Sequence, residues 1–358
     1  GLMTKFSGDI GLQFTIHIAN EYPVPKIVDL TKVALDQGFD QVWVNDNLCH
    51  RNIFVVLAAI AAQVPIRLGS AILVPYFRNP VDLADSIASL TELTDGRELS
   101  IGIARGAHAI AGNQVTAEKP LATVRETVAS VKALISGETV TYKDYPNVGS
   151  YFHLNPDWEF KLEFDAQAPV RFYSGGNGPK ILKIAARIMD GILIGGYYIP
   201  LVRTGRLAAM LEPPRALAAK VQPNNPQYDN CELNVSISRN RDAAFQFAKP
   251  YVSHMLISLK QMGFTDDEFR TIFVEPGLVK AVDDAFKNGA TVDQAAQIIP
   301  DEAVKSCFVV GEPEECKDQI LDLMQYAEDL NFGQVCLAKL GPDYKEAITL
   351  LRQVVLTE

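Results

Sequence analysis

Short apolar segments alternate with segments of helical spacing along most of the chain. Eight strand-like runs appear, and helical stretches separate them. The predicted strands are Ile10–Ile18, Phe39–Val44, Ile66–Val74, Glu98–Ala104, Val170–Tyr173, Ile192–Ile194, Leu233–Ser238 and Gln334–Lys339. Apolar strands that alternate with helices are typical of a parallel sheet covered on both faces. Eight such units in 358 residues favour an α/β fold, the closed (β/α)8 TIM barrel, over an open sheet.

Proline and glycine mark the ends of the predicted helices. Pro80 stands where a helix would begin, and Gly137 stands where one would end, as expected for these residue types. Pro213 and Pro214 predict an interruption of the helical segment Tyr198–Lys220, because proline removes a helical hydrogen bond. The other predicted helices are Pro25–Gln37, Arg51–Gln63, Pro80–Thr94, Thr116–Ser136, Pro179–Met189, Glu312–Leu330 and Tyr344–Val355.

Two segments do not follow the repeat. Residues 137–168 are polar and aromatic, and the strand-like runs Thr139–Tyr142 and Tyr151–Leu154 predict a hairpin. Residues 242–306 have helical spacing and lie between the seventh and eighth predicted strands, where they predict a lid or packing arm. The chain is therefore interpreted as one barrel domain, residues 1–358, with insertions after strand four and between strands seven and eight.

Composition and charge exclude several classes of function. The net charge of −10 and the lack of a basic run disfavour a nucleic-acid partner. Five cysteines without a CxxC pair are typical of free thiols in a reducing compartment. No histidine pair has metal-ligand spacing, so no metal site is expected. No apolar run reaches membrane-spanning length, and we expect a cytoplasmic protein.

A glycine-rich turn follows the fifth predicted strand. Phe172-Tyr173-Ser174 leads into Gly175-Gly176-Asn177-Gly178, and Pro179 then begins a helix. Glycines permit a close approach of the backbone, and the first amides of a helix attract anions. The turn is therefore either a cradle for an anion such as phosphate or a βα turn without a ligand.

In a (β/α)8 barrel the active site is built from the loops that follow the strands. Asp46 follows strand two, where it is either a carboxylate beside a ligand or a helix cap. Arg105 follows strand four and either binds a phosphate or pairs with a carboxylate such as Asp46. Histidine changes its charge most readily near neutral pH. The remaining candidates at strand ends are Gln13, His17, His50 and His108.

Several motifs, in order along the chain, resemble the luciferase-like family of flavin and deazaflavin oxidoreductases. The resemblance covers nearly the whole chain and is greatest to its methylenetetrahydromethanopterin reductases. The motifs are Trp43-Val44-Asn45-Asp46, Leu68-Gly69 through Val74-Pro75-Tyr76-Phe77-Arg78-Asn79-Pro80, Ser174-Gly175-Gly176-Asn177-Gly178-Pro179, Asp190-Gly191, Phe308-Val309-Val310-Gly311-Glu312-Pro313-Glu314 and Gly341-Pro342-Asp343.

The resemblance implies a (β/α)8 barrel whose cofactor ring lies across the mouth. It implies a non-prolyl cis peptide at Ala71-Ile72, in a bulge of strand three behind the ring. It also implies that Asp46 lies near the cofactor and that Gly175–Gly178 hold the cofactor's tail or phosphate.

Three positions depart from the family pattern. Asn47 replaces a histidine that many relatives have after the strand-two acid. The acidic residue that the reductase carries on strand one is replaced by Gln13 or by His17, depending on the alignment. Arg105 resembles the arginine that contacts the FMN phosphate in bacterial luciferase, whereas the reductase has no arginine there.

The function implied is hydride transfer between coenzyme F420 and a small organic substrate. The alternative is an FMN-dependent two-component monooxygenase supplied by a flavin reductase, and a non-catalytic flavin-binding protein is the third possibility. Val55–Ala62 is apolar on nearly every face, whereas a surface helix should show a polar stripe. A homodimer that covers this helix is therefore expected.

Overall fold

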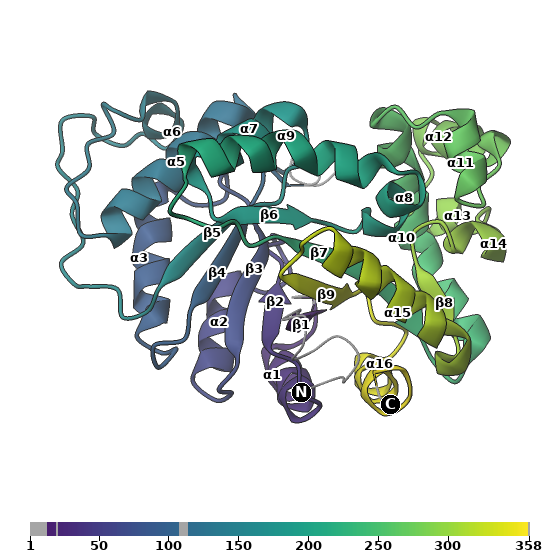
Figure 1. Cartoon of the computed structure of the whole chain (residues 1–358). Helices are drawn as coiled ribbons and strands as arrows, with labels where there is room; N and C mark the ends of the chain where they lie inside the picture. The colour runs from purple at the N-terminus through teal and green to yellow at the C-terminus, as the bar shows by residue number, and fades with distance from the viewer. Residues whose placement is uncertain (1–12, 19–20, 107–113, 357–358) are drawn as a thin grey trace.

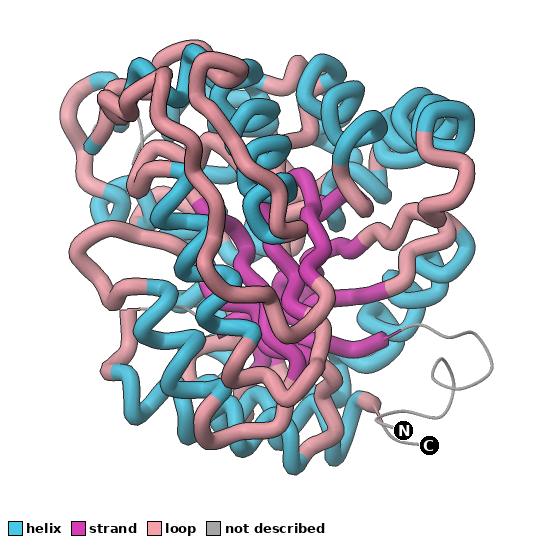
Figure 2. Tube along the Cα trace, turned by 90° about the vertical axis from the view of Figure 1, so that its left-hand side faces the viewer, coloured by secondary structure: helices cyan, strands magenta, loops and turns pink. Residues whose placement is uncertain are grey.

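Eight parallel strands form a closed ring in the computed structural model, which describes residues 13–18, 21–106 and 114–356. The order is β6-β5-β4-β3-β2-β1-β9-β7, and pairing of β6 with β7 closes the ring. Figure 2 shows the strands at the centre with helices around them. The strands are β1 Gln13–Ile18, β2 Gln41–Val44, β3 Arg67–Leu73, β4 Leu99–Ile103, β5 Val170–Ser174, β6 Gly191–Ile194, β7 Asn230–Ile237 and β9 Gln334–Ala338. The parallel barrel-like fold is therefore confirmed.

Helices follow the strands and cover the outside of the ring (Figure 1). Side-chain caps define where several of them begin: Asn52 accepts hydrogen bonds from Phe54 and Val55, and Asn79 accepts one from Asp82. Such caps satisfy amides that have no partner within the helix. These helices are α1 Val24–Asp36, α2 Ile53–Ala61, α3 Pro80–Thr91, α5 Pro120–Ile135, α7 Pro179–Ile188, α8 Tyr198–Arg203, α9 Arg206–Val221, α15 Pro313–Asp329 and α16 Tyr344–Leu350, which continues as the π-helix η1 Leu351–Val355.

The helical segment at 198–220 is interrupted at a different place from the one predicted. Pro213 and Pro214 lie inside α9, and the break falls at Thr204–Gly205 instead. Gly205 has φ +74°, a backbone conformation that glycine adopts without steric cost. The predicted interruption at the two prolines is therefore wrong.

Residues 137–168 do not form the predicted hairpin. A single antiparallel bridge joins Val140 and Phe160, and the helix α6 Pro146–Tyr151 lies between them. The buried carboxylate of Glu126 on α5 accepts hydrogen bonds from the backbone amides of Asn147 and Val148. These amides belong to the first turn of α6, so a contact from α5 satisfies them and favours a helix there.

Residues 241–304 are helical, as the spacing predicts, and form a group on one side of the barrel (Figure 1). The helices are α10 Arg241–Gln261, α11 Asp266–Thr271, α12 Pro276–Lys287, α13 Val292–Ala296 and α14 Asp301–Val304. A short strand that the sequence did not indicate, β8 Val309–Gly311, follows them and pairs with the end of β7. No helix in the described part of the chain is long and apolar enough to cross a membrane.

Large side chains fill the lumen of the barrel below its mouth. Trp43, Tyr173, Leu193 and Cys336 pack together there. The indole N–H of Trp43 donates a hydrogen bond of 3.0 Å to Gln334. Because these described side chains fill the lumen, as in other barrels of this type, we place the candidate site at the carboxyl ends of the strands.

Candidate active site

A non-prolyl cis peptide lies at the mouth of the barrel. The Ala71–Ile72 bond is cis, and the register of β3 against β4 shifts between Ser70 and Leu73. The predicted cis peptide is therefore confirmed. The side chain of Ile72 extends past β4 to Gly175, directly after β5. The two residues are so close that a Cβ atom added to Gly175 would lie 2.5 Å from Cγ2 of Ile72.

The glycine turn after β5 lies against this bulge. The amide of Gly175 donates a hydrogen bond of 2.9 Å to Ile103, which places the turn beside the end of β4. Gly178 precedes α7 and faces open space, since no atom lies within 4 Å of the position of its Cβ. The Oδ1 atom of Asn177 is buried and has no hydrogen-bond partner among the described residues. A buried acceptor without a partner is costly, so the turn suits a ligand that donates a hydrogen bond.

The buried carboxylate of Asp46 forms an ion pair with a partly buried arginine that the sequence analysis did not identify as its partner. Its two carboxylate oxygens accept hydrogen bonds of 2.8 and 3.0 Å from the guanidinium of Arg78. Its Oδ2 also accepts a hydrogen bond of 3.0 Å from the amide of Val74. The side chains of Asp46 and Arg78 are 3% and 12% exposed. Asp46 therefore joins the end of β2 to the loop after the β3 bulge.

Two alternatives considered for Asp46 are thereby corrected. Its partner is Arg78 and not Arg105, because the loop after β3 brings Arg78 against β2. Asp46 is also not a helix cap, since Asn52 has that role at α2. Arg78 lies within a motif that carries the family resemblance. Its charge follows the apolar stretch Val74–Phe77, which could have indicated that Arg78 needs a carboxylate partner such as Asp46.

Arg105 is exposed at the end of β4, on the same side of the mouth as Tyr76. Burial raises the pKa of Tyr76, and the positive charge of Arg105 opposes that rise. The Tyr76 hydroxyl donates a hydrogen bond of 2.7 Å to the carbonyl of Glu118. Arg105 makes no ion pair with any residue that the structure describes, so its guanidinium is available to an anionic ligand.

The candidate catalytic residues, which are Gln13 and the three histidines at strand ends, are placed only in part. His50 is exposed in the turn between β2 and α2. In the backbone register of β1, His17 is opposite Trp43 of β2 and Gln13 is opposite Gln334 of β9. The structure describes the backbone of His17 and Gln13 but not their side chains. His108 lies outside the described residues.

Polar residues missed by the sequence analysis line the side of the mouth formed by β7 and β9. Asn234 on β7 donates hydrogen bonds of 2.9 and 3.0 Å to the carbonyls of Gly196 and Cys307. Lys339, directly after β9, donates one of 3.3 Å to Asn234 Oδ1. Glu232 is half-buried on β7. The sequence held one clue to these residues, because the polar residues Glu232 and Asn234 flank Leu233, the first residue of the predicted strand.

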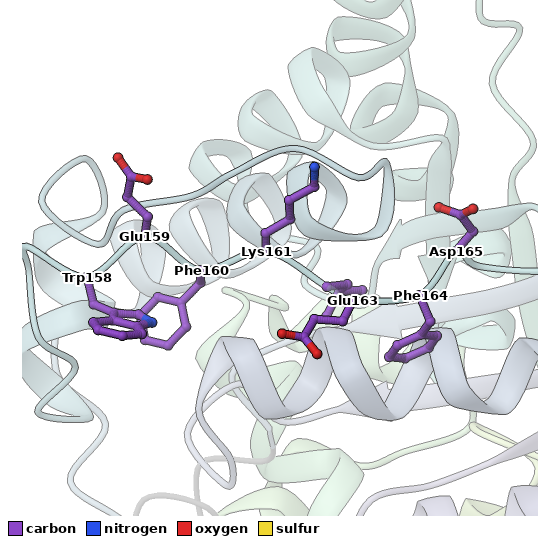
Figure 3. A pocket seen from close by; sticks show the side chains of 8 residues that line it. Trp158, Glu159, Phe160, Lys161, Glu163, Phe164 and Asp165 are labelled. Atoms are coloured by element: carbon purple, nitrogen blue, oxygen red, sulfur yellow. The ribbon is translucent and has the colours of Figure 1, made fainter.

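A hollow of about 560 Å³ lies away from this mouth, in the segment between α5 and β5. Figure 3 shows Glu159, Lys161 and Asp165 on one side of its extended backbone and Trp158 on the other. All of its lining residues come from the run 158–165, and no strand end contributes to it. It is therefore separate from the candidate active site.

The comparisons with known proteins identify the family. The luciferase-like monooxygenase family matches residues 10–328. A 5,10-methylenetetrahydromethanopterin reductase from Methanolobus tindarius is 26% identical over 351 residues, covering 96% of this chain and 100% of the relative.

Two solved structures share the fold. That of the coenzyme F420 dependent tetrahydromethanopterin reductase from Methanopyrus kandleri superposes with a TM-score of 0.74 at 22% identity, over 96% of this chain and 98% of the other. The structure of the monooxygenase RslO1 from Streptomyces bottropensis superposes with a TM-score of 0.63 at 18% identity, and the match covers 96% of this chain and 99% of that one. The chain therefore belongs to the luciferase-like family and is an oxidoreductase.

Proposed function

We propose that this protein transfers a hydride between coenzyme F420 and a small organic substrate at the mouth of the barrel. The observation that carries the proposal is the contact between the cis bulge at Ile72 and the glycine turn at Gly175. The bulge has an apolar surface on which the flat ring of the cofactor can lie, and the glycine turn beside it leaves space for the cofactor's tail. The choice of coenzyme is supported by three relatives, each matching 96% of the chain, that are named 5,10-methylenetetrahydromethanopterin reductases.

The residues at the mouth fit such a cofactor. The unpartnered oxygen of Asn177 can accept a hydrogen bond from a hydroxylated tail, and Gly178 leaves space beside it. Arg105 can bind a phosphate through two parallel hydrogen bonds. When bound, the deazaflavin supplies the hydride chemistry, while the chain supplies orientation and excludes water. Asp46 contributes by holding the loop that follows the bulge.

The alternative is an FMN-dependent monooxygenase that receives reduced flavin from a partner reductase. Arg105 favours it, since a free guanidinium at the strand-four end is suited to the terminal phosphate of FMN. The oxygen-activating chemistry would still need the same ring position over Ala71 and Ile72. A non-catalytic flavin-binding protein is the third candidate, favoured only by Asn47, and by Gln13 or His17 according to the alignment, at positions where relatives have acid–base residues.

Titration of the purified protein with F420 and, separately, with FMN distinguishes these candidates. We expect F420 to bind with a micromolar or lower Kd, followed by its fluorescence, and FMN to bind at least tenfold more weakly. The Gly175→Ala variant should bind neither well, because the added methyl group would collide with Ile72. Micromolar binding of FMN without binding of F420 would contradict the proposal and favour the monooxygenase.

We further propose that the barrel is a single cytoplasmic domain whose insertions, 137–168 and 242–306, shape the substrate pocket. Loops and insertions on a barrel are free to vary without loss of the scaffold.

A homodimer through α2 is part of the same proposal. Val55 on its outer face is 59% exposed although the helix is apolar throughout. Val55→Lys should convert a dimer to a monomer in analytical ultracentrifugation, because the charge would be buried at the interface. Val221→Lys, at a similarly exposed valine on α9, is the matched control and should leave the mass unchanged. A monomeric unaltered protein would refute the dimer.

A further inference from the structure

β7 places a carboxylate inside the barrel. Cys231 and Leu233 pack into the layer between the strands and the outer helices, so Glu232 between them points to the lumen, because side chains alternate along a strand. Its register partner on β9 is Cys336, which packs in the lumen against Trp43 and Tyr173. Paired residues of parallel strands share a face, so both arguments place Glu232 in the lumen.

Glu232 lies at the upper end of the packed lumen. Asn230 is the register partner of Leu193, which belongs to the packed cluster, and Glu232 is the next inward position towards the mouth. The following inward position is Asn234, which carries the contact with Lys339. Positions two apart on one face of a strand are separated by about 6.6 Å. Glu232 is half-buried rather than buried, as expected of a side chain that faces an opening.

Other inward or buried carboxylates in this protein have clear structural partners. Asp46 binds Arg78, Asp229 binds Arg215, and Glu126 binds the first turn of α6. Glu232 makes no hydrogen bond or ion pair with the side chains that the structure describes. A half-buried carboxylate without such a partner has lost part of its hydration with no contact to offset that cost, so a role in the site, rather than in the fold, accounts for its position.

We propose that Glu232 exchanges the proton that accompanies hydride transfer, which rests on the function proposed above. In the oxidative direction, the substrate's C–H bond breaks and its hydride passes to the deazaflavin. The O–H or N–H bond on a heteroatom beside that carbon breaks as well, and its proton passes to the Glu232 carboxylate. The electron pair left on that heteroatom forms a new bond to the carbon, which is C=O or C=N where the two atoms are already bonded and a C–N single bond where they are not, as in a 5,10-methylene group. In the reductive direction the carboxylic acid returns the proton to the heteroatom as the hydride reaches carbon.

The surrounding groups indicate the class of substrate. Lys339 and Asn234 form the rim directly above Glu232, and Lys339 has no carboxylate partner among the described side chains. Asn234 fixes the position of Lys339, and the ammonium of Lys339 beside the reacting heteroatom suits a polar alcohol or a secondary amine and its oxidised form. The titratable and charged groups of the elements around Glu232 are Cys336 of β9, Lys339 directly after it, Tyr173 of β5, Tyr197 after β6 and, by backbone register, His17 of β1.

The test compares Glu232→Gln with Glu212→Gln, a matched change at an exposed glutamate on α9. The first readout is thermal unfolding of the cofactor-free protein at pH 8. Because the charge at Glu232 lacks a partner, its removal should leave Tm unchanged or raise it by a few degrees. A structural carboxylate would behave in the opposite way, and a fall in Tm of several degrees would overturn the proposal.

The second readout is the pH–rate profile between pH 5 and 9, with reduced F420 and 5,10-methylenetetrahydromethanopterin as the probe substrate. Loss of a general acid–base group costs about 10²- to 10⁴-fold in rate. Glu232→Gln should lower kcat by at least 100-fold, change KM less than threefold, and remove one limb of the profile. An unchanged kcat would overturn the proposal, and so would a profile with both limbs retained.

Cofactor titration separates this proposal from the one on which it rests. Failure of the proposed function would appear in the unaltered protein, which would then not bind F420. Failure of the present inference would appear as a Glu232→Gln variant that binds F420 and behaves like Glu212→Gln in both readouts.

Discussion

Asp46→Asn is expected to destabilise the protein by about 3 kcal/mol, because it leaves the partly buried guanidinium of Arg78 without its charged partner. The carboxylate makes two hydrogen bonds to Arg78 and one to the amide of Val74, and an asparagine side chain cannot accept all three in the same geometry. Urea unfolding followed by circular dichroism measures the change in the free energy of unfolding.

An exposed ion pair provides the control for this prediction. Asp284→Asn removes the partner of Lys280 on α12, where the two side chains are 49% and 78% exposed. Such pairs contribute at most about 0.5 kcal/mol. If Asp46→Asn cost no more than Asp284→Asn, the Asp46–Arg78 pair would not stabilise the fold.

The same pair also bears on the site. Asp46 has been expected to lie near the cofactor, and its carboxylate oxygens are occupied by Arg78 and Val74. We therefore expect it to act by positioning the loop after the bulge. The double variant Asp46→Asn, Arg78→Met should recover most of the lost stability, since no charge is then buried alone.

Arg105→Ala is expected to weaken cofactor binding by about 1.5–3 kcal/mol, the range for a hydrogen bond to a charged group. This corresponds to a Kd about 10- to 150-fold higher. The structure leaves the guanidinium without an ion-pair partner in the described part of the chain and places it at the mouth near Tyr76. Fluorescence titration of the variant with F420 and with FMN measures the effect.

Riboflavin, which lacks the phosphate, makes the measurement specific. Its affinity should be the same for Arg105→Ala and for the unaltered protein, because the guanidinium is expected to contact only phosphate. Arg187→Ala, at an exposed position in the last turn of α7, is the control for loss of an arginine. Equal Kd values for F420 or FMN in Arg105→Ala and Arg187→Ala would show that Arg105 does not bind the phosphate.

The spacing of apolar residues was sufficient to predict the barrel. Each of the eight predicted strands overlaps a strand of the ring, because burial on both faces makes these segments almost wholly apolar. The glycine turn was equally readable, since Pro179 begins α7 as predicted. The cis peptide at Ala71–Ile72 followed from family resemblance and not from any local pattern.

Errors arose where the partner of a segment lies far away in the sequence. Residues 137–168 have strand-like runs, yet Glu126 on α5 satisfies the first turn of a helix there. Only Arg105 was considered from the sequence as a partner for Asp46, whereas the path of the loop after β3 brings Arg78 to it.

The sequence by itself determined the order of the eight barrel strands, the glycine turn and, through its motifs, the family, because periodicity and turn chemistry depend on neighbours along the chain. Only the tertiary structure decided which charges meet and which carboxylate enters the lumen. Strand seven was predicted to start at Leu233, which left Glu232 outside it, whereas pairing with β6 and β9 extends β7 back to Asn230. Pairing with neighbouring strands sets the length of a strand and decides which of its side chains point into the barrel. Closure of the ring depends on all eight strands together.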